Sequence, residues 1–207
     1  MYARTTTVRG DPRAMDEGIA FCRDEVWPTV RGMSGCVGMS MLADREDGRC
    51  IVTTAWASDE AMAASAEMVK DIRSRAAEAL RADAVDVEDW QIAILHRMRP
   101  AGDDACVRAT WTDIRPGEAD HMADSFRMAV MPRLEEMPGF CSLSLMVDRM
   151  RNRGVGTVTF ENRAALENSR ELTMRMREEV VPRMPATITE TAEFELVMAH
   201  LHVPEMA

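Results

Sequence analysis

The chain has 207 residues, of which 46% are hydrophobic and 29% charged, a balance typical of a globular protein rather than a disordered one. Its formal net charge of −10 argues against nucleic acid and against an anionic membrane as partners. No apolar stretch is long enough to span a membrane, no secretion signal is visible at the start, and the cysteines lack metal-type spacing, so we expect a cytoplasmic protein.

The sequence repeats itself without gaps, so that Arg4 to Pro100 align with Arg108 to Pro204. A repeat of this kind predicts two copies of one structural module. We assign 1–99 to the first module, 100–105 to a linker and 106–207 to the second. Identical pairs run through both copies and include Arg4/Arg108, Thr6/Thr110, Asp16/Asp120, Arg23/Arg127, Pro28/Pro132, Gly35/Gly139, Ser65/Ser169, Arg73/Arg177 and His96/His200.

Each copy opens with a segment that predicts a strand, at 2–9 and at 107–114. Apolar residues at helical spacing then predict a first helix in each copy, and Pro28 or Pro132 should kink this helix or end it early. Asp16 and Arg23 lie seven residues apart on this helix, as do Asp120 and Arg127, and we interpret them as surface ion pairs.

The second half of each copy predicts two strands joined by a hairpin, then a helix and a last strand. The helix has a good N-cap at Ser58 or Asn162. The strands are expected at 37–41, 50–57 and 87–97 in the first copy and at 141–145, 154–161 and 192–201 in the second.

The order of elements is therefore β-α-β-β-α-β, twice, which predicts an α+β fold of two ferredoxin-like modules in tandem. Helices cover only one face of each four-stranded sheet, and the other face needs a cover. We expect the two sheets to pack face to face as an intramolecular dimeric α/β barrel. The protein would then be a monomeric pseudo-dimer or a further homo-oligomer.

The alternation of residues along the strands predicts which side chains lie beneath the helices. The apolar phase belongs there, whereas Arg4, Thr6, Arg108 and Thr110 are expected between the two sheets. A buried arginine needs a partner, and we expect Arg4 or Arg108 to meet Glu195 or a strand-end carbonyl. Such a polar seam either fixes the register of the two copies or anchors a ligand.

Several segments resemble the antibiotic biosynthesis monooxygenase family. They are Met137-Pro138-Gly139-Phe140, 143–148 and 157–162 in the second copy, and the strand-to-helix segment 54–61 in the first. The resemblance covers nearly the whole chain. It implies a dimeric α/β barrel whose pockets lie between sheet and helices, in a family that includes monooxygenases using O₂ without metal or flavin.

The family also includes haem-degrading enzymes, which use a histidine on the second helix and an asparagine on the first strand. Here neither second helix contains a histidine, and the first strands have Thr6 and Thr110 instead. Haem degradation is therefore disfavoured, and we expect no cofactor. Trp56 does match the tryptophan of the family's pocket.

His96 and His200 are the candidate catalytic residues, because they recur at one place in both copies and imidazole can transfer protons near neutral pH. The alternative is a strand-end histidine bonded to backbone. The candidate substrate-binding residues are the apolar ones of the expected pockets: Met39, Met41, Trp56, Trp90, Leu143, Phe160 and Phe194.

Together with the family resemblance, these residues suggest two functions. The first is a monooxygenase acting on a small aromatic molecule of quinol or polyketide type. The second is a barrel without catalytic activity that binds a small ligand or a protein partner. Divergence between the copies, such as Trp56 against Phe160 and Thr54 against Val158, permits one active and one degenerate half.

Overall fold

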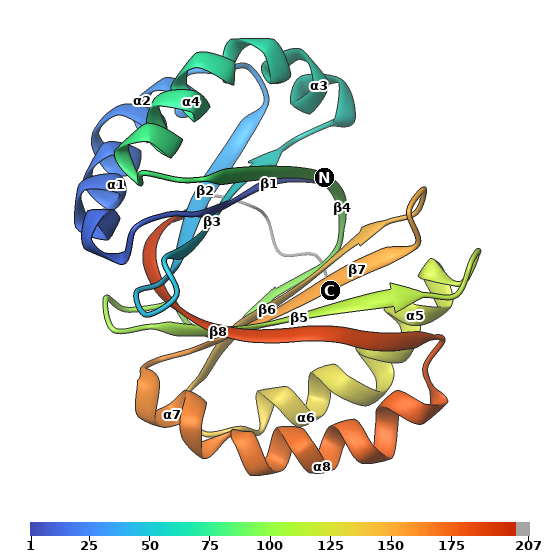
Figure 1. The fold of residues 1–207 in the computed structure, drawn as a ribbon. Coiled ribbons are helices and arrows are strands. Elements are labelled where there is room, and N and C mark those ends of the chain that lie inside the picture. The colour runs from blue at the N-terminus through green and yellow to red at the C-terminus, as the bar shows by residue number, and fades with distance from the viewer. Residues whose placement is uncertain (202–207) are drawn as a thin grey trace. The chain divides into compact units, whose positions relative to one another are not determined.

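The computed structural model describes residues 1–201 and contains the predicted elements twice (Figure 1). The first copy consists of β1 (Tyr2–Arg9), a short 3₁₀ turn η1 (Pro12–Ala14), α1 (Met15–Phe21), the π-helical segment η2 (Cys22–Val26), α2 (Trp27–Arg31), β2 (Cys36–Asp44), β3 (Arg49–Trp56), α3 (Asp59–Met68), α4 (Lys70–Ala79) and β4 (Ala84–Arg97).

The second copy repeats this order. It consists of β5 (Cys106–Ile114), α5 (Ala119–Ser125), the π-helical segment η3 (Phe126–Val130), α6 (Met131–Glu135), β6 (Phe140–Asp148), β7 (Arg153–Phe160), α7 (Arg163–Asn168), α8 (Arg170–Val180), the 3₁₀ turn η4 (Val181–Arg183) and β8 (Ala186–Leu201). Within residues 1–201, no helix is both long and apolar enough to cross a membrane.

Within the first unit the hydrogen-bonded neighbours follow the order β4-β1-β3-β2-β8, and within the second unit they follow the order β8-β5-β7-β6-β4. The four strands of each copy have the ferredoxin-like order, with the first strand of the copy between its third and fourth. The predicted α+β fold class is thereby confirmed.

The chain divides into two compact units that do not coincide with the two repeats. Among the described residues, the first unit contains Met1–Trp90 and the part of β8 that begins at Glu195, and the second contains Gln91–Phe194. The last strand of each copy therefore ends in the other unit: the end of β8 pairs with β2, and the end of β4 pairs with β6. Each unit borrows one strand end from the other copy.

The first helix of each copy continues through its proline by widening one turn. Proline has no N–H to donate and its ring obstructs a regular α-helical turn. Just before each proline, the N–H of Trp27 bonds to the carbonyl of Cys22, and that of Met131 to Phe126, a five-residue step. The helix therefore continues past the proline through η2 or η3. Of the two expected outcomes, a kink or an early end, the early end does not occur.

The second helix of each copy is broken into two. Ser58 and Asn162 cap its start as predicted, accepting hydrogen bonds from the N–H groups of Ala61 and Ala165. In the second copy the break falls at Ser169, whose hydroxyl donates to the carbonyl of Leu166 at 2.7 Å. Such a bond within the helix is a local alternative to the regular ladder.

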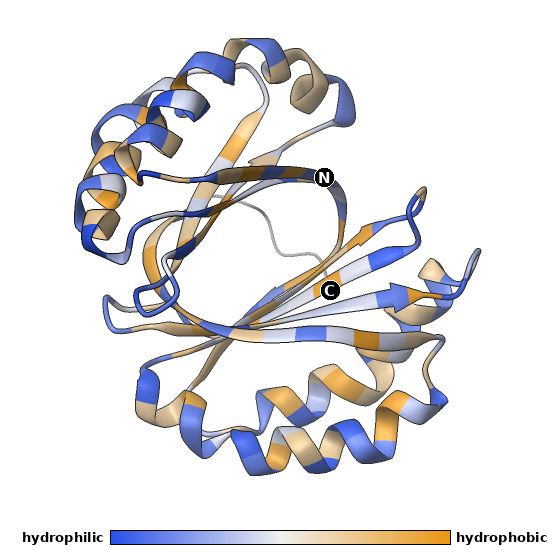
Figure 2. Ribbon diagram, viewed as in Figure 1, coloured by the Kyte–Doolittle hydropathy of each residue, from blue (hydrophilic) through white to orange (hydrophobic). Residues whose placement is uncertain are grey.

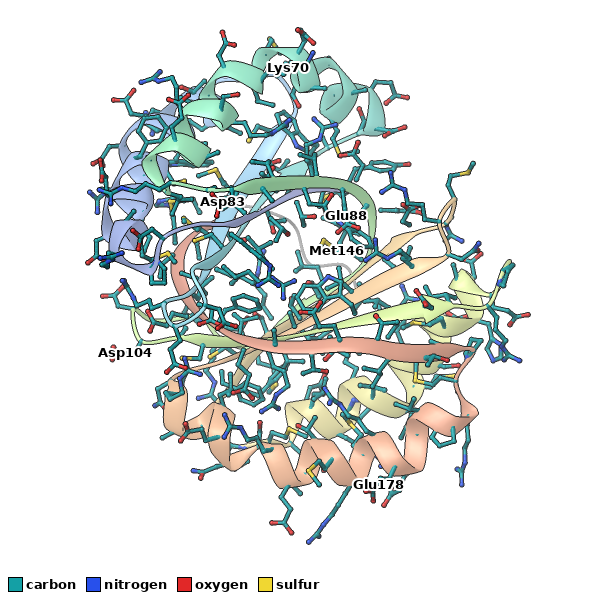
Figure 3. All side chains as sticks on the ribbon, viewed as in Figure 1. Lys70, Asp83, Glu88, Asp104, Met146 and Glu178 are labelled. Atoms are coloured by element: carbon teal, nitrogen blue, oxygen red, sulfur yellow. The ribbon has the colours of Figure 1, made fainter. Side chains whose placement is uncertain are left out.

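Each unit has its own hydrophobic core between one face of its sheet and its helices. The helices direct hydrophobic residues toward this sheet face and hydrophilic residues outward (Figure 2). Lys70 on α4 and Glu178 on α8 extend from the outer helix surfaces (Figure 3). Burial of these helix faces supplies the main stabilisation of each unit.

Candidate functional site

Each unit contains a cavity between its sheet and its helices. The first cavity, in the first unit, has a volume of about 60 Å³, and the second cavity, in the second unit, about 100 Å³. Their linings are equivalent in the repeat. Thus Arg4, Thr6 and Trp56 in the first cavity correspond to Arg108, Thr110 and Phe160 in the second.

The second cavity has an apolar and adaptable wall. Alternate residues of β5 and β7 form its floor, including Gly156 and Phe160. The π-helical segment η3 turns Phe126 and Val130 toward it, and Met122, Met176 and Met184 complete the wall. Methionine side chains are unbranched and change rotamer easily, so this wall can adjust to an apolar ligand.

Arg108 forms the polar end of the second cavity and is held by five hydrogen bonds. Its guanidinium donates to Ser169 and Thr173 at 2.9 Å each, to the carbonyl of Leu166 at 2.9 Å, and twice to Glu193, at 2.9 and 3.2 Å. The break at Ser169 places the Leu166 carbonyl within reach. A cation with only 6% of its side chain exposed is thus fully compensated.

Arg177 lies beside Arg108 and has a different environment. It bridges the hydroxyls of Thr110 and Thr191, at 3.0 Å each, and no described carboxylate bonds to it. Burial lowers the pKa of the Arg177 guanidinium, and the charge of Arg108 lowers it further, while Glu193 opposes both. Arg177 is therefore a half-buried cation at the cavity wall that lacks a close counter-charge.

The first cavity has the equivalent polar residues, but the charge of its arginine, Arg4, is less well compensated. Arg4 bonds to Asp89 at 2.7 and 2.9 Å and to Ser65 and the Met62 carbonyl at 3.3 and 3.2 Å. Half of the Asp89 side chain is exposed, against 20% for its counterpart Glu193. Burial and the Arg4 charge lower the pKa of Arg73, the counterpart of Arg177.

The predicted placement of the strand arginines between the sheets was wrong. Arg4, Thr6, Arg108 and Thr110 all lie on the helix-covered side and line the cavities. The expected partner was wrong too, because Glu195 bonds to Arg45 at 2.8 Å. The arginines are satisfied beneath the helices by Asp89, Glu193 and the carbonyls of the broken helices, which no strand pattern reveals.

The predicted helix ion pairs do not form either. Asp16 bonds to Arg45 at 2.7 Å, and its repeat equivalent Asp120 bonds to Arg149 at 2.6 Å. Arg23 and Arg127 pair with Asp24 and Asp124 instead. The hairpin arginines are the closer partners.

The predicted substrate-binding residues divide into three groups. Trp56 lines the first cavity and Phe160 the second. Met39 and Met41 belong to the core of the first unit and Leu143 to that of the second, and none of them lines a cavity. Trp90 and Phe194 are buried outside both cavities, with the Trp90 indole donating to Thr5, on the opposite sheet face from Arg4.

His96 and His200 lie outside both cavities, in different settings. The His96 Nε2 atom is 3.0 Å from a carboxylate oxygen of Glu135. His200 is exposed and stacks on Trp27, with ring centroids 5.0 Å apart and an interplanar angle of 10°. Their catalytic role stays a prediction.

Sequence reasoning missed the polar residues of the cavities as a site. Four of the residue pairs that are identical between the copies lie at the polar ends of the cavities and could have indicated the site. They are Arg4/Arg108, Thr6/Thr110, Ser65/Ser169 and Arg73/Arg177. Polar residues repeated at strand and helix positions indicate a common network more directly than a repeated strand-end histidine does.

The potential metal ligands of residues 1–201 are scattered. No group of three potential ligands among histidine, cysteine, aspartate and glutamate occurs there. Burial raises the pKa of Cys22, at the wall of the first cavity, to about 11, so it remains a neutral thiol. The second helices, α3–α4 and α7–α8, offer no histidine.

Comparisons with known proteins agree with this architecture. Residues 1–68 match the family model described as antibiotic biosynthesis monooxygenase. Two proteins of Mycobacterium tuberculosis, Rv2558 and Rv2557, both described as uncharacterized, are 45% and 41% identical over the whole chain, which covers 87% and 92% of their lengths. The crystal structure of an anthrone oxidase-like protein aligns with a TM-score of 0.70 and 12% identity, covering 100% of this chain and 95% of the other. The chain belongs to the antibiotic biosynthesis monooxygenase family.

Proposed function

We propose that the second cavity is the site of a cofactor-independent monooxygenase that oxidises a small aromatic quinol. The observation that carries this proposal is the placement of Arg177, a cation without a close counter-charge, at the wall of an apolar cavity with an adaptable methionine surface. Membership of the family and likeness to an anthrone oxidase-like protein support the same chemistry.

The cavity volume limits the size of the ligand. A cavity of about 150 Å³ in a protein core is known to hold benzene. The second cavity, at about 100 Å³, takes a single ring if Met122, Met176 and Met184 shift, whereas the first cavity has no such margin. A one-ring quinol fits these limits better than a fused polyketide.

The reaction requires the ionised form of the quinol, which passes an electron to O₂ more readily than the neutral phenol does. A phenol has a pKa near 10, and a guanidinium in contact with an acid can lower its pKa by about 1–3 units. Arg177 would therefore make the phenolate accessible near pH 7–9, with the proton released to solvent. The guanidinium then stabilises the anion in a dry site.

The overall reaction balances without a cofactor. A ring C–H bond breaks and a C–O bond forms, the O–O bond of O₂ breaks, and the second oxygen atom leaves as water. The quinol, having lost electrons, becomes a hydroxyquinone. No histidine is needed at the reacting atoms, which is consistent with the positions of His96 and His200.

Oxygen uptake with a panel of one-ring quinols and anthrones tests the proposal. Gly156→Val should abolish uptake, because a Cβ at Gly156 has room, with Phe126 at 3.8 Å, and the added methyl groups would enter the cavity. The matched reverse change, Val52→Gly, alters the first cavity at the equivalent position and should leave uptake intact. Equal activity in both variants would contradict the proposal.

The second candidate function is ligand binding without chemistry. It is favoured by the lack of a general base in the second cavity, whose lining residues include no histidine and no carboxylate. Saturable quenching of protein fluorescence by a quinol, with no oxygen consumed, would establish this alternative.

A further inference from the structure

Among the described arginines of the two cavities, Arg73 alone has no bonded partner. Its guanidinium lies at the wall of the first cavity and makes no hydrogen bond or ion pair with any described residue. The residue is partly buried, and burial and the charge of Arg4 lower the pKa of Arg73, while Asp89 opposes them. A partly desolvated cation with available donors favours the binding of an anion.

The second copy explains why Arg73 has no partner. Its counterpart Arg177 is held by the hydroxyls of Thr110 and Thr191, at 3.0 Å each. The first copy has a threonine equivalent to Thr110, but Val87 stands at the position of Thr191 and its side chain offers no acceptor. The five N–H donors of the Arg73 guanidinium are therefore available to a ligand.

The charges around Arg73 leave an excess of positive charge at the first cavity. Arg4 and Arg73 both line this cavity, and Asp89 is the carboxylate that acts on Arg73. Both Asp89 oxygens are taken by Arg4, at 2.7 and 2.9 Å. The charge of Arg73 thus remains without a bonded counter-charge. The second unit differs, because there Glu193 also binds Arg170, and the first copy has no arginine at the equivalent position.

The rest of the cavity wall limits the size and polarity of a ligand. Aliphatic side chains form much of it, including Val8, Val26, Val30, Val52, Ile72 and Leu80. Valine is branched at Cβ and adjusts little, so the volume of about 60 Å³ excludes an aromatic ring, since benzene is known to occupy a cavity of about 150 Å³. A water-sized group needs roughly 10–15 Å³, so the cavity takes about four such groups in a row.

We propose that the first cavity binds a short aliphatic monocarboxylate, whose carboxylate pairs with Arg73 and whose hydrocarbon chain lies against the valine side chains. The planar fork of a guanidinium matches a carboxylate with two parallel hydrogen bonds. The volume sets the length of the acid at about three or four carbon atoms. This site is separate from the oxidation proposed for the second cavity, because the two cavities share no lining residue.

Titration calorimetry of the full-length protein with butyrate and butyramide tests the proposal, because the two probes have the same shape and differ in charge. Butyrate should bind roughly tenfold more tightly than butyramide, since hydrogen bonds to a charged group are the stronger ones. This preference should fall as salt is raised. Arg73→Gln should bring the preference close to one, and it should not disturb the fold because it breaks no bond to a described residue.

The control is Arg75→Gln on the same helix, because Arg75 lies 3.8 Å from Glu25 and does not line the cavity. It should leave the preference for butyrate unchanged. Absence of butyrate binding, or a preference that Arg73→Gln does not alter, overturns the inference. Inorganic phosphate that binds as tightly as butyrate also overturns it, because the hydrocarbon chain would then contribute nothing. None of these results bears on oxygen uptake, which tests the proposed function separately.

Discussion

The two cavities share their polar residues and differ in their apolar walls and outer charges. Arg4, Ser65 and Arg73 of the first copy are matched by Arg108, Ser169 and Arg177 of the second. The walls are not matched, since Val52 faces the first cavity where the second has Gly156. The polar network is common to both copies, whereas the space and charge around it differ between them.

Loss of the inner arginine should have the largest effect, and it should differ between the copies. Arg108→Leu removes five hydrogen bonds from a charged donor, and although Glu193 keeps Arg170, the loss should cost about 3 kcal/mol of stability. Arg4→Leu should cost less, because the half-exposed Asp89 recovers water. Hydrogen exchange of β5 and β1 in the two variants measures this, and equal loss of protection would contradict the comparison.

Arg177 and its counterpart Arg73 both line a cavity, but replacing them should affect activity in the second copy only. Arg177→Gln should lower kcat/KM for a quinol by about 100-fold, the effect of removing one donor to a developing anion. The midpoint of the rate against pH should also rise toward 10, because the phenolate loses its counter-charge. Arg73→Gln is the matched control and should change the rate less than twofold. The opposite result would place the reaction in the first cavity.

Alkaline pH should destabilise the first unit selectively. Burial raises the pKa of Cys22 to about 11 and that of Cys50 to about 12, from an ordinary value of 9.0. The folded state holds these protons more tightly, so the stability they contribute is present below pH 9 and is lost as the pH rises toward 12. The second copy has Phe126 and Gly154 at these positions.

Hydrogen exchange between pH 8 and pH 11, corrected for the intrinsic exchange rate, should show loss of protection in β2 and β3 before β6 and β7. The variant Cys22→Val/Cys50→Ala should remove this difference between the units. Simultaneous loss of protection in both units of the wild type would contradict the role of the thiols.

Replacement of the two repeated histidines should have the smallest effect. His96→Gln/His200→Gln should retain the oxygen-uptake rate within about twofold, since neither ring lines a cavity. The contacts with Glu135 and Trp27 would be lost, with a small decrease in stability. A tenfold fall in rate without unfolding would instead assign these residues a catalytic role.

The fold could be predicted from the sequence because the same order of elements, including the helix caps Ser58 and Asn162, occurs at equivalent positions in both copies. The strand phases of β2 and β6 were also right, with Met39, Met41 and Leu143 in the cores. The phase of the last strand was not, because β4 has an irregularity between Ile92 and Ile94 that moves Trp90 and Ile94 to different faces. A bulge of this kind changes alternation without a clear sequence signal.

The candidate site was predicted only in part. Trp56 and Phe160 were placed correctly by their apolar character, and the cavities lie between sheet and helices as the family resemblance implied. The arginines were assigned to the wrong face, because polar residues on a strand are expected away from a core. Their compensation depends on Glu193 and on carbonyls exposed by a helix break, and both are tertiary features.

The exchanged strand ends have a consequence for how such a chain arose. Residues 91–97 of the first copy are equivalent to residues 195–201, which complete the sheet edge beside β2. A fragment cut within 100–105 would lack residues 195–201 but would keep the equivalent residues 91–97. Two copies of this fragment could therefore exchange these strand ends, as in a domain-swapped dimer. Joining the halves in one polypeptide makes their assembly independent of protein concentration. The two halves need not be identical, so each can change its sequence independently of the other.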